Sequence, residues 1–364
     1  MNSSALIYII GYLVVGLAYG VYGDAYGSKT CVSALYNFGD SNSDTGAGYA
    51  AFAGVHPPSG ESFFGNLSGR LCDGRLIIDF LTEELKLPYL SAYLNSLGSN
   101  YRHGANFAVG GASIRPGGFS PFDLGVQIAQ FKQFKYGANV LYNRTEPPFK
   151  SGLPRPDEFS KALFTFDIGQ NDLGYGFQHG SEEQVRSSIP NILETFHQAV
   201  QQLYSEGARI FWIHNTGPSG CLPNRVIYYK PKQGNLDANG CIKSQNEIAQ
   251  EFNRQLKEQL FDLNKKLPLA KFTYVDVYSA KYQLISDAKK QGFVSPLLSC
   301  CGSLNCGTQV TVNGTVYGKP CKNPSQHVIW DGVHYSQAAN LWVAKRILSG
   351  SFSEPLVSIG KACF

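Results

Sequence analysis

The sequence predicts an α/β protein with a mostly parallel, five-stranded sheet that helices cover on both faces. Short apolar runs alternate along the chain with segments of helical periodicity, and this alternation is typical of parallel strands joined by helices. Several of the apolar runs end at a glycine that polar residues follow. Open α/β sheets bind ligands at the carboxyl ends of their strands, so these polar residues are candidates for a functional site.

The five predicted strands are short apolar segments. They comprise residues 34–38, 106–109, 162–168, 209–214 and 271–278. The first strand ends at Gly39, the second at Gly110 and the third at Gly169. Each of these three is therefore interpreted as a buried strand that opens into a loop.

Three helices are predicted from the spacing of apolar residues. Two occupy residues 189–204 and 248–263, directly before the fourth and fifth strands. The third contains the apolar residues of 341–348, and Ser336 is a suitable N-cap for it. The proline-rich segment 146–156 is interpreted as a surface loop. Because the chain shows neither an internal repeat nor a low-complexity linker, we expect one domain with long insertions.

Composition excludes several classes of protein. The chain has 364 residues, of which 43% are hydrophobic and 16% charged, as in globular proteins. Its formal net charge of +4 is small for this length. No run of Lys and Arg is long enough for a nucleic-acid groove, so we expect no nucleic-acid partner.

Residues 1–27 are predicted to be a secretory signal peptide. Residues 5–19 are apolar but short for a membrane span, and cleavage is expected after Gly20 or Gly27. The apolar run has no preceding Lys or Arg, so a retained N-terminal anchor is the alternative. No later run reaches about 18 apolar residues. We therefore expect a mature domain of residues 28–364 that has no stable membrane association.

Glycosylation sequons and cysteines agree with secretion. Acceptor sequons begin at Asn66, Asn143 and Asn313. The nine cysteines suit an oxidising compartment, and their odd number leaves one unpaired or intermolecular. Cys221 and Cys241 bracket a loop rich in Gly, Pro and Asn and are predicted to pair.

A second group of cysteines lies close together in the sequence. It comprises Cys300, Cys301, Cys306 and Cys321. Four such residues are also compatible with a metal site. They lack the paired C-x-x-C spacing of zinc ligands and lie in a chain expected to be secreted, so disulfides are favoured and no metal is expected.

Four blocks carry residues suited to hydrolytic acyl transfer. They are residues 38–44, 106–112, 169–172 and 331–334. This chemistry needs a nucleophile, hydrogen-bond donors for an oxyanion, and a histidine that a carboxylate orients. Ser41 lies where the first strand gives way to a loop, which exposes its Oγ at the sheet edge. The alternative for such a serine is a helix N-cap, a role that Ser43 and Asp44 fit better.

Asp331 and His334 are the predicted partners of Ser41. Their separation of three residues lets the carboxylate reach imidazole Nδ1 and leaves Nε2 for the serine. Four other histidines compete for this role, but none has a carboxylate at a suitable offset. They are His103, His179, His214 and His327.

The predicted oxyanion donors are the backbone N–H of Ser41, a glycine amide and an asparagine side chain. Gly111 follows the second strand, and Gly110 is a rival for the same role. Asn171 offers a neutral carboxamide, which donates to an oxyanion without adding a charge. Both have structural alternatives, since glycine permits positive φ and Asn-Asp is common in turns.

As a set, these blocks resemble those of plant GDSL esterases/lipases of the SGNH hydrolase superfamily. The resemblance runs from about Leu35 to the end of the chain, and Asn42 stands where the family name has Leu. That form is typical of a subgroup with early-nodulin-like proteins and acetylesterases. The resemblance implies a flavodoxin-like, three-layer α/β/α fold without a cofactor or metal. The implied triad is Ser41, Asp331 and His334, and the implied oxyanion hole is Ser41, Gly111 and Asn171.

The resemblance also implies a monomeric, secreted serine esterase acting on small-molecule or glycan esters. Short acyl groups such as acetyl are favoured, and the destination is the apoplast or cell wall, with the vacuole as an alternative. The triad does not distinguish hydrolysis from acyl transfer to an alcohol, nor does it exclude a lipase with longer-chain substrates. A glycosidase needs two opposed carboxylates, and the acidic residues of the blocks are better explained by a serine site. A binding protein without turnover would not need all five residues.

Overall fold

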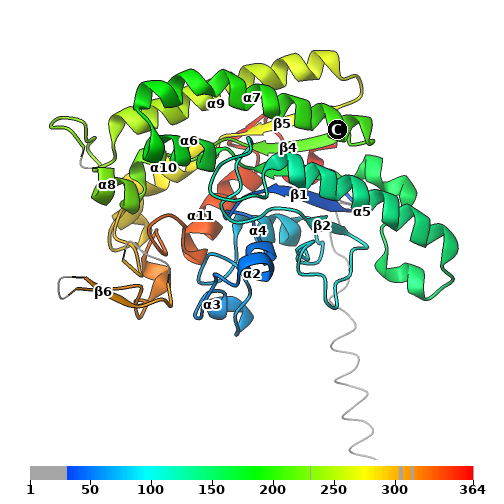
Figure 1. The fold of residues 1–364 in the computed structure, drawn as a ribbon, viewed down its shortest axis with the longest axis horizontal. Helices are drawn as coiled ribbons and strands as arrows, with labels where there is room; N and C mark the ends of the chain where they lie inside the picture. The colour runs from blue at the N-terminus through cyan, green and yellow to red at the C-terminus, as the bar shows by residue number, and fades with distance from the viewer. Residues whose placement is uncertain (1–30, 230, 303–305, 313–314, 364) are drawn as a thin grey trace, which may run out of the picture. The chain divides into compact units, whose positions relative to one another are not determined.

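One central sheet lies between two layers of helices (Figure 1). The structure is a computed structural model, and it describes residues 31–363 except 230, 303–305 and 313–314. The predicted signal peptide and the sequon at Asn313 lie outside the described residues. Within the described part of the chain, no helix combines the length and apolar character needed to cross a bilayer.

The sheet has the order β2-β1-β3-β4-β5-β8. Five strands are parallel: β1 (Leu35–Gly39), β2 (Gly104–Asn106), β3 (Leu163–Asp167), β4 (Ile210–His214) and β5 (Lys271–Val275). The predicted α/β class and the five parallel strands are therefore confirmed. The order places β1 between β2 and β3, so the carboxyl ends of the three strands that precede candidate blocks are neighbours.

Two details of the sheet differ from the prediction. A sixth strand, β8 (Ser353–Glu354), pairs antiparallel with β5, and two residues are too few to show a period in sequence. The second strand begins earlier than predicted and ends at Asn106. Its continuation still follows β1, because Phe107 N and Val109 N donate to the carbonyl oxygens of Asn37 and Gly39.

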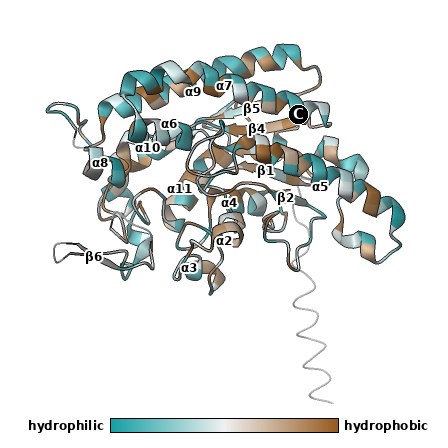
Figure 2. Ribbon diagram, viewed as in Figure 1, coloured by the Kyte–Doolittle hydropathy of each residue, from teal (hydrophilic) through white to brown (hydrophobic). Residues whose placement is uncertain are grey.

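Alternating side chains of the strands build a core on each face of the sheet. Tyr36 and Phe38 of β1 belong to the core on one face, which α7 (Glu182–Ser205) and α9 (Lys243–Lys266) help to cover. Leu35 belongs to the core on the other face, which α4 (Ile77–Glu84) and α11 (Gln337–Leu348) help to cover. Successive residues of a strand point to opposite faces, so a continuous apolar strand fills both cores. Figure 2 shows the outer surfaces of α7 and α9 as largely hydrophilic.

Three of the helices follow the predicted periodicity, whereas the long helix α5 (Leu124–Arg144) was not predicted. The helices are α2 (Ala47–Phe52), α3 (Glu61–Phe64), α4 (Ile77–Glu84), α5 (Leu124–Arg144), α6 (Gln170–His179), α7 (Glu182–Ser205), α8 (Pro223–Tyr229), α9 (Lys243–Lys266), α10 (Val277–Asp287) and α11 (Gln337–Leu348). The three predicted helices lie within α7, α9 and α11. Ser336 caps α11 as expected, because its side chain accepts from Ala339 N.

Two shorter features complete the described chain. A hairpin of β6 (Val310–Val312) and β7 (Thr315–Tyr317) stands apart from the main sheet. The segment predicted as a surface loop contains a turn of 3-10 helix at Phe149–Gly152 and ends where another begins at Pro156.

The described cysteines form four disulfides. Cys221–Cys241 is confirmed, and the second group pairs as Cys300–Cys321 and Cys301–Cys306. His327 lies beside the Cys300–Cys321 pair, but sulfurs engaged in a disulfide are not thiolate ligands. The fourth disulfide, Cys31–Cys363, joins the two ends of the described chain. The unpaired cysteine is Cys72, which is buried.

Candidate active site

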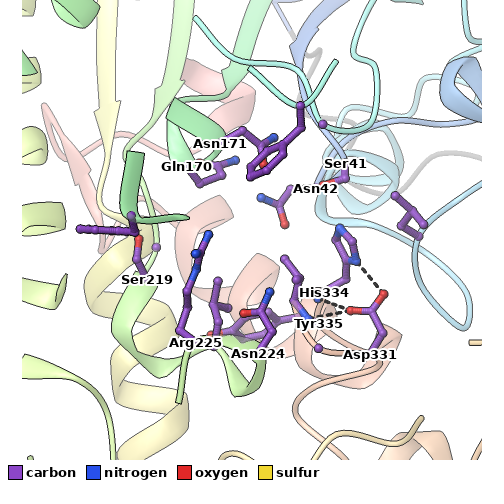
Figure 3. A pocket seen from close by; sticks show the side chains of 18 of the residues that line it. Ser41, Asn42, Gln170, Asn171, Ser219, Asn224, Arg225, Asp331, His334 and Tyr335 are labelled. Carbon is purple, nitrogen blue, oxygen red and sulfur yellow. Dashed lines mark hydrogen bonds and ion pairs between the residues drawn. The ribbon is translucent and has the colours of Figure 1, made fainter. Parts of the chain in front are cut away.

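A cavity of about 770 Å³ opens at the carboxyl edge of the sheet. Its lining includes all five residues singled out from the sequence: Ser41, Gly111, Asn171, Asp331 and His334. Figure 3 shows Ser41, Asn171 and His334 around this cavity, with a dashed line that joins Asp331 to the histidine. Four segments far apart in the sequence therefore meet at one place.

Ser41 lies in a tight turn directly after β1. Gly39 is held on both sides, since its N–H donates to Gln127 Oε1 (2.9 Å) and its carbonyl accepts from Gln127 Nε2 (2.8 Å). A Cβ on Gly39 would lie 2.5 Å from the carbonyl oxygen of Asp167, so this close approach of β1 to β3 requires glycine. The side chain of Asp40 accepts from Asn42 N (3.0 Å) and closes the turn around the serine.

Asp44 connects this turn to the loop that contains Gly111, residues 110–115 (the Gly111 loop). Its carboxylate accepts from the N–H groups of Gly46, Ala47 and Gly48 at the start of α2, as a cap does. It also accepts from Gly110 N (2.8 Å). Ser43, expected to share the capping role, instead accepts from Asn37 Nδ2 in the core. Asp44 therefore binds the first N–H groups of α2 without Ser43, although the N-cap residue itself is Gly46.

The two glycines of the Gly111 loop are thereby distinguished. The N–H of Gly110 is engaged by Asp44, whereas the N–H of Gly111 donates to no group among the described residues. Gly111 has a φ of +78°, a conformation that L side chains rarely adopt. The backbone N–H of Ser41 is likewise unengaged within the described part of the chain.

Asn171 and Asp172 both connect α6 to the Gly111 loop. Asn171 Nδ2 donates to the carbonyl of Ala112 (3.0 Å), which leaves its second amide hydrogen for the cavity that it lines. Asp172 accepts from Ile114 N (2.7 Å) and Arg115 N (3.1 Å). Burial raises the pKa of Asp172 to about 6, although both backbone N–H groups oppose this shift.

Asp331 orients His334 through both of its oxygens. Oδ2 is 2.7 Å from His334 Nδ1, and Oδ1 accepts from the backbone N–H groups of Val333 and His334, each at 2.7 Å. Burial alone would raise the pKa of Asp331, but His334 and the donated hydrogen bonds outweigh burial and hold the pKa below its usual range. The contact with Nδ1 leaves Nε2 for the cavity (Figure 3). No direct hydrogen bond joins Ser41 Oγ to His334 in the described structure.

One of the four other histidines also contacts a carboxylate, at a distant position in the sequence. His214 has a carboxylate partner, because its Nδ1 lies 3.2 Å from Asp167 Oδ2. The sequence argument compared local offsets, and these two residues are brought together only by the pairing of β3 with β4. His214 Nε2 accepts from Trp212 Nε1 (3.2 Å), so both ring nitrogens are engaged and the ring is buried outside the cavity lining.

Several cavity residues carried no signal in the sequence. They include Ser219, Asn224, Arg225 and Lys281. None belongs to a repeated or regularly spaced pattern. Only their position beside the four blocks in the folded chain makes them candidates for substrate contacts.

The doubly covered parallel sheet, with Ser41, Asp331 and His334 at one cavity of its carboxyl edge, defines an α/β acylhydrolase of the SGNH class. The chain belongs to the GDSL-like lipase/acylhydrolase family, whose sequence model matches residues 35–347. The resemblance drawn from the four blocks is thus confirmed, and the protein is a carboxylic ester hydrolase.

Relatives align over almost the whole chain. A GDSL esterase/lipase of Arabidopsis thaliana is 52% identical over 352 residues, covering 92% of this chain and 90% of its own. The GDSL esterase/lipase ENOD8 of Medicago truncatula is 44% identical and covers 93% of this chain and 92% of its own. A protein named alpha-L-fucosidase 3, from Arabidopsis thaliana, is 47% identical, with 91% of each chain covered.

Proposed function

We propose that this protein is a secreted serine esterase with Ser41 as nucleophile, His334 as general base and Asp331 as the group that orients the histidine. One observation carries the proposal. The cavity unites a serine, a carboxylate-bound histidine and two unengaged backbone N–H groups, those of Ser41 and Gly111.

The proposed reaction proceeds through an acyl-enzyme. His334 Nε2 takes the proton of Ser41 as Oγ attacks the ester carbonyl, and Asp331 stabilises the resulting imidazolium. The N–H groups of Ser41 and Gly111, with the free amide hydrogen of Asn171, donate to the oxyanion. The imidazolium then protonates the departing alcohol. His334 next activates water, which attacks the acyl group and releases the acid and the serine.

Two other reactions use similar cavities. An acyltransferase would carry out the same first step and replace water by an alcohol in the second. A glycosidase is suggested by the name of one relative, alpha-L-fucosidase 3. It would need two carboxylates across the scissile bond, and the only carboxylate among the described lining residues is Asp331, which is bound to His334. Ester hydrolysis is therefore the favoured reaction.

We further propose short acyl groups, such as acetyl esters of glycosides, polysaccharides or specialised metabolites. The lining offers many polar side chains, among them Asn42, Gln170 and Ser219, which suit a polar alcohol part better than a long acyl chain. Four disulfides among the described residues, with exposed sequons at Asn66 and Asn143, support secretion and glycosylation.

The test is the Ser41→Ala variant, assayed with p-nitrophenyl esters from acetyl to octanoyl. We expect complete loss of hydrolysis without a change in melting temperature, because the hydroxyl contributes no described hydrogen bond. A serine-directed phosphonate should label Ser41 of the wild type. Labelling of Ser43 would overturn the assignment of the nucleophile, and a higher kcat/KM for octanoyl than for acetyl esters would overturn the short-chain substrate.

A further inference from the structure

The charges that face the cavity are not balanced. Among the described lining residues there are two basic side chains, Arg225 and Lys281, and one carboxylate, Asp331. That carboxylate accepts hydrogen bonds from His334 and from its own loop. No lining carboxylate therefore remains to pair with either cation.

Lys281 has acidic neighbours that do not belong to the cavity lining. Its side chain is only 5% exposed, and its ammonium lies 4.7 Å from the centroid of the Tyr335 ring. Burial lowers the pKa of Lys281, while the nearby carboxylates of Asp167 and Asp40 oppose that shift. Lys281 thus has two acidic neighbours within the protein.

The charge of Arg225 has no such balance. Its Nη2 donates to the carbonyl of Gly174 (2.9 Å), and its guanidinium lies 6.0 Å from the centroid of the Phe177 ring. No ion pair involving Arg225 occurs in the described part of the chain. Burial lowers the pKa of Arg225, and no acidic group counteracts it. Most of the N–H donors of this guanidinium are therefore available to a ligand.

The position of Arg225 is determined by the surrounding structure. α6 has a glycine where the guanidinium crosses it, since a Cβ on Gly174 would lie 2.7 Å from Nη2. α8 is held to the loop of His334, because Asn224 N donates to Gly332 O (3.1 Å). The Cys221–Cys241 disulfide precedes α8 directly. Figure 3 shows Arg225 pointing into the cavity from the side opposite Ser41 and His334.

We propose that Arg225 forms an anion subsite, and that the preferred substrates are esters whose alcohol part carries a carboxylate, such as acylated sugar acids. This inference rests on the proposed function. A guanidinium binds a carboxylate through parallel hydrogen bonds, which an ammonium cannot reproduce. The neighbouring polar groups suit hydroxyls on the same molecule, and one of them, Asn224 Oδ1, is buried and without a partner in the described structure.

The subsite should act on substrate binding more than on the chemical step. The carboxylate of the substrate lies away from the ester carbonyl that reacts. Its contact with Arg225 is therefore the same in the ground state and in the transition state. Such uniform binding lowers KM and leaves kcat nearly unchanged. A charge-assisted contact of this kind corresponds to a difference of about tenfold or more in KM.

The experiment compares acetylated methyl glucuronoside with acetylated methyl glucoside, which differ in the carboxylate. We expect the wild type to have a KM about tenfold lower for the glucuronoside, and unacetylated methyl glucuronoside to inhibit p-nitrophenyl acetate hydrolysis more strongly than methyl glucoside does. Arg225→Gln should bring the ratio of the two KM values close to one. Arg225→Lys should restore part of the preference for the glucuronoside. The matched control is Arg254→Gln on the exposed side of α9, which should keep the wild-type ratio.

Each contrary outcome has a separate meaning. Equal KM values and equal inhibition in the wild type would overturn the anion subsite. A parallel rise of both KM values in Arg225→Gln, with a lower melting temperature and an unchanged ratio, would assign Arg225 to holding α6 and would also overturn it. Failure of the wild type to hydrolyse any ester would overturn the proposed function. If the wild type hydrolyses p-nitrophenyl acetate, the proposed function stands, and the comparison of the two inhibitors then tests the anion subsite alone.

Discussion

At the scale of single residues, backbone N–H groups decide which positions can serve an oxyanion. Gly110 and Gly111 are adjacent and chemically identical, but Asp44 engages the N–H of the first and leaves that of the second free. The side chain of Asn171 is only partly engaged, because one of its amide hydrogens binds the carbonyl of Ala112 and the other is available. This residue therefore has both a structural and a proposed chemical role, which experiments can separate.

Replacing Asn171 with Ala should lower kcat by roughly 10²–10³ with little change in KM, because the bond to the oxyanion tightens only in the transition state. Asn171→Asp should lower kcat further, since a carboxylate repels the developing negative charge. Steady-state kinetics and melting temperature are measured on the same preparation. A lower melting temperature with an unchanged kcat would remove Asn171 from the oxyanion hole.

His334→Ala should reduce kcat about as much as loss of the serine, by roughly 10⁴–10⁶, because nucleophile and base act as a unit. Asp331→Asn should leave more residual activity. Its carbonyl oxygen can still accept from Val333 N and His334 N, but its amide group presents a donor to Nδ1 and disfavours the required tautomer. His179→Ala, at the exposed end of α6, is the control and should hydrolyse p-nitrophenyl acetate normally. Normal turnover in His334→Ala would eliminate the triad.

At the scale of elements, two buried carboxylates hold the Gly111 loop at both ends. Asp44 binds the loop at Gly110 and Asp172 binds it at Ile114 and Arg115. The first carboxylate comes from the block after β1 and the second from the start of α6. Three candidate blocks are thus tied to one another through backbone N–H groups, which keeps Ser41, Gly111 and Asn171 around the same cavity.

This arrangement predicts a pH dependence of stability. Burial raises the pKa of Asp172 to about 6, above the value of about 4 expected in the unfolded chain. Between these two pKa values the folded state binds more protons than the unfolded state. The contribution of Asp172 to the free energy of unfolding therefore falls as pH rises from about 4 to 6. Relative to Asp172→Asn, which does not titrate there, the wild type should lose about 2–3 kcal/mol of unfolding free energy across that window.

Denaturant unfolding of both variants at several pH values from 4 to 7.5 measures this difference. The Asn variant removes the titration and retains an oxygen that can accept from the Gly111 loop, so it isolates the effect of charge. If the advantage of the wild type instead grows with pH, the ionised carboxylate is the stabilising form and the pKa of Asp172 is lowered by folding.

At the scale of the whole molecule, the Cys31–Cys363 disulfide closes almost the entire described chain, with a sequence separation of 332 residues. Cross-linking distant residues reduces the entropy of the unfolded chain, and the effect grows slowly with loop length. Replacing both cysteines with Ala should therefore lower the unfolding free energy by about 3–5 kcal/mol. Because neither cysteine lines the cavity, kcat for acetyl esters at 25 °C should not change.

The Cys221–Cys241 pair is the matched comparison. Its removal opens a loop with a sequence separation of only 20 residues, so the expected loss of stability is smaller. It lies next to α8, however, and α8 is bonded to Gly332 in the loop of His334. We expect this double variant to lose kcat/KM as well. The reverse pattern, with activity lost only on removal of Cys31–Cys363, would contradict both expectations.

The sequence by itself determined the chemical blocks, the parallel strands and the helices α7, α9 and α11, because each depends on residues close together in the chain. Glycines at strand ends, the three-residue spacing of Asp331 and His334, and the helical period within α7 and α9 are all local patterns. Even the Cys221–Cys241 pair was predictable, since it closes a short loop of distinct composition.

The tertiary structure alone decided which of these groups are free and which are occupied. Asp44 reaches Gly110, Asp167 reaches His214 and Arg225 reaches Gly174 only because strand pairing and helix packing bring distant segments together. Each of these contacts engages one hydrogen-bonding group and leaves others free. The type of a residue does not reveal whether its hydrogen-bonding groups are engaged. The unengaged N–H of Gly111, the engaged ring of His214 and the unbalanced charge of Arg225 therefore follow from the fold, since burial and partners are properties of the packed chain.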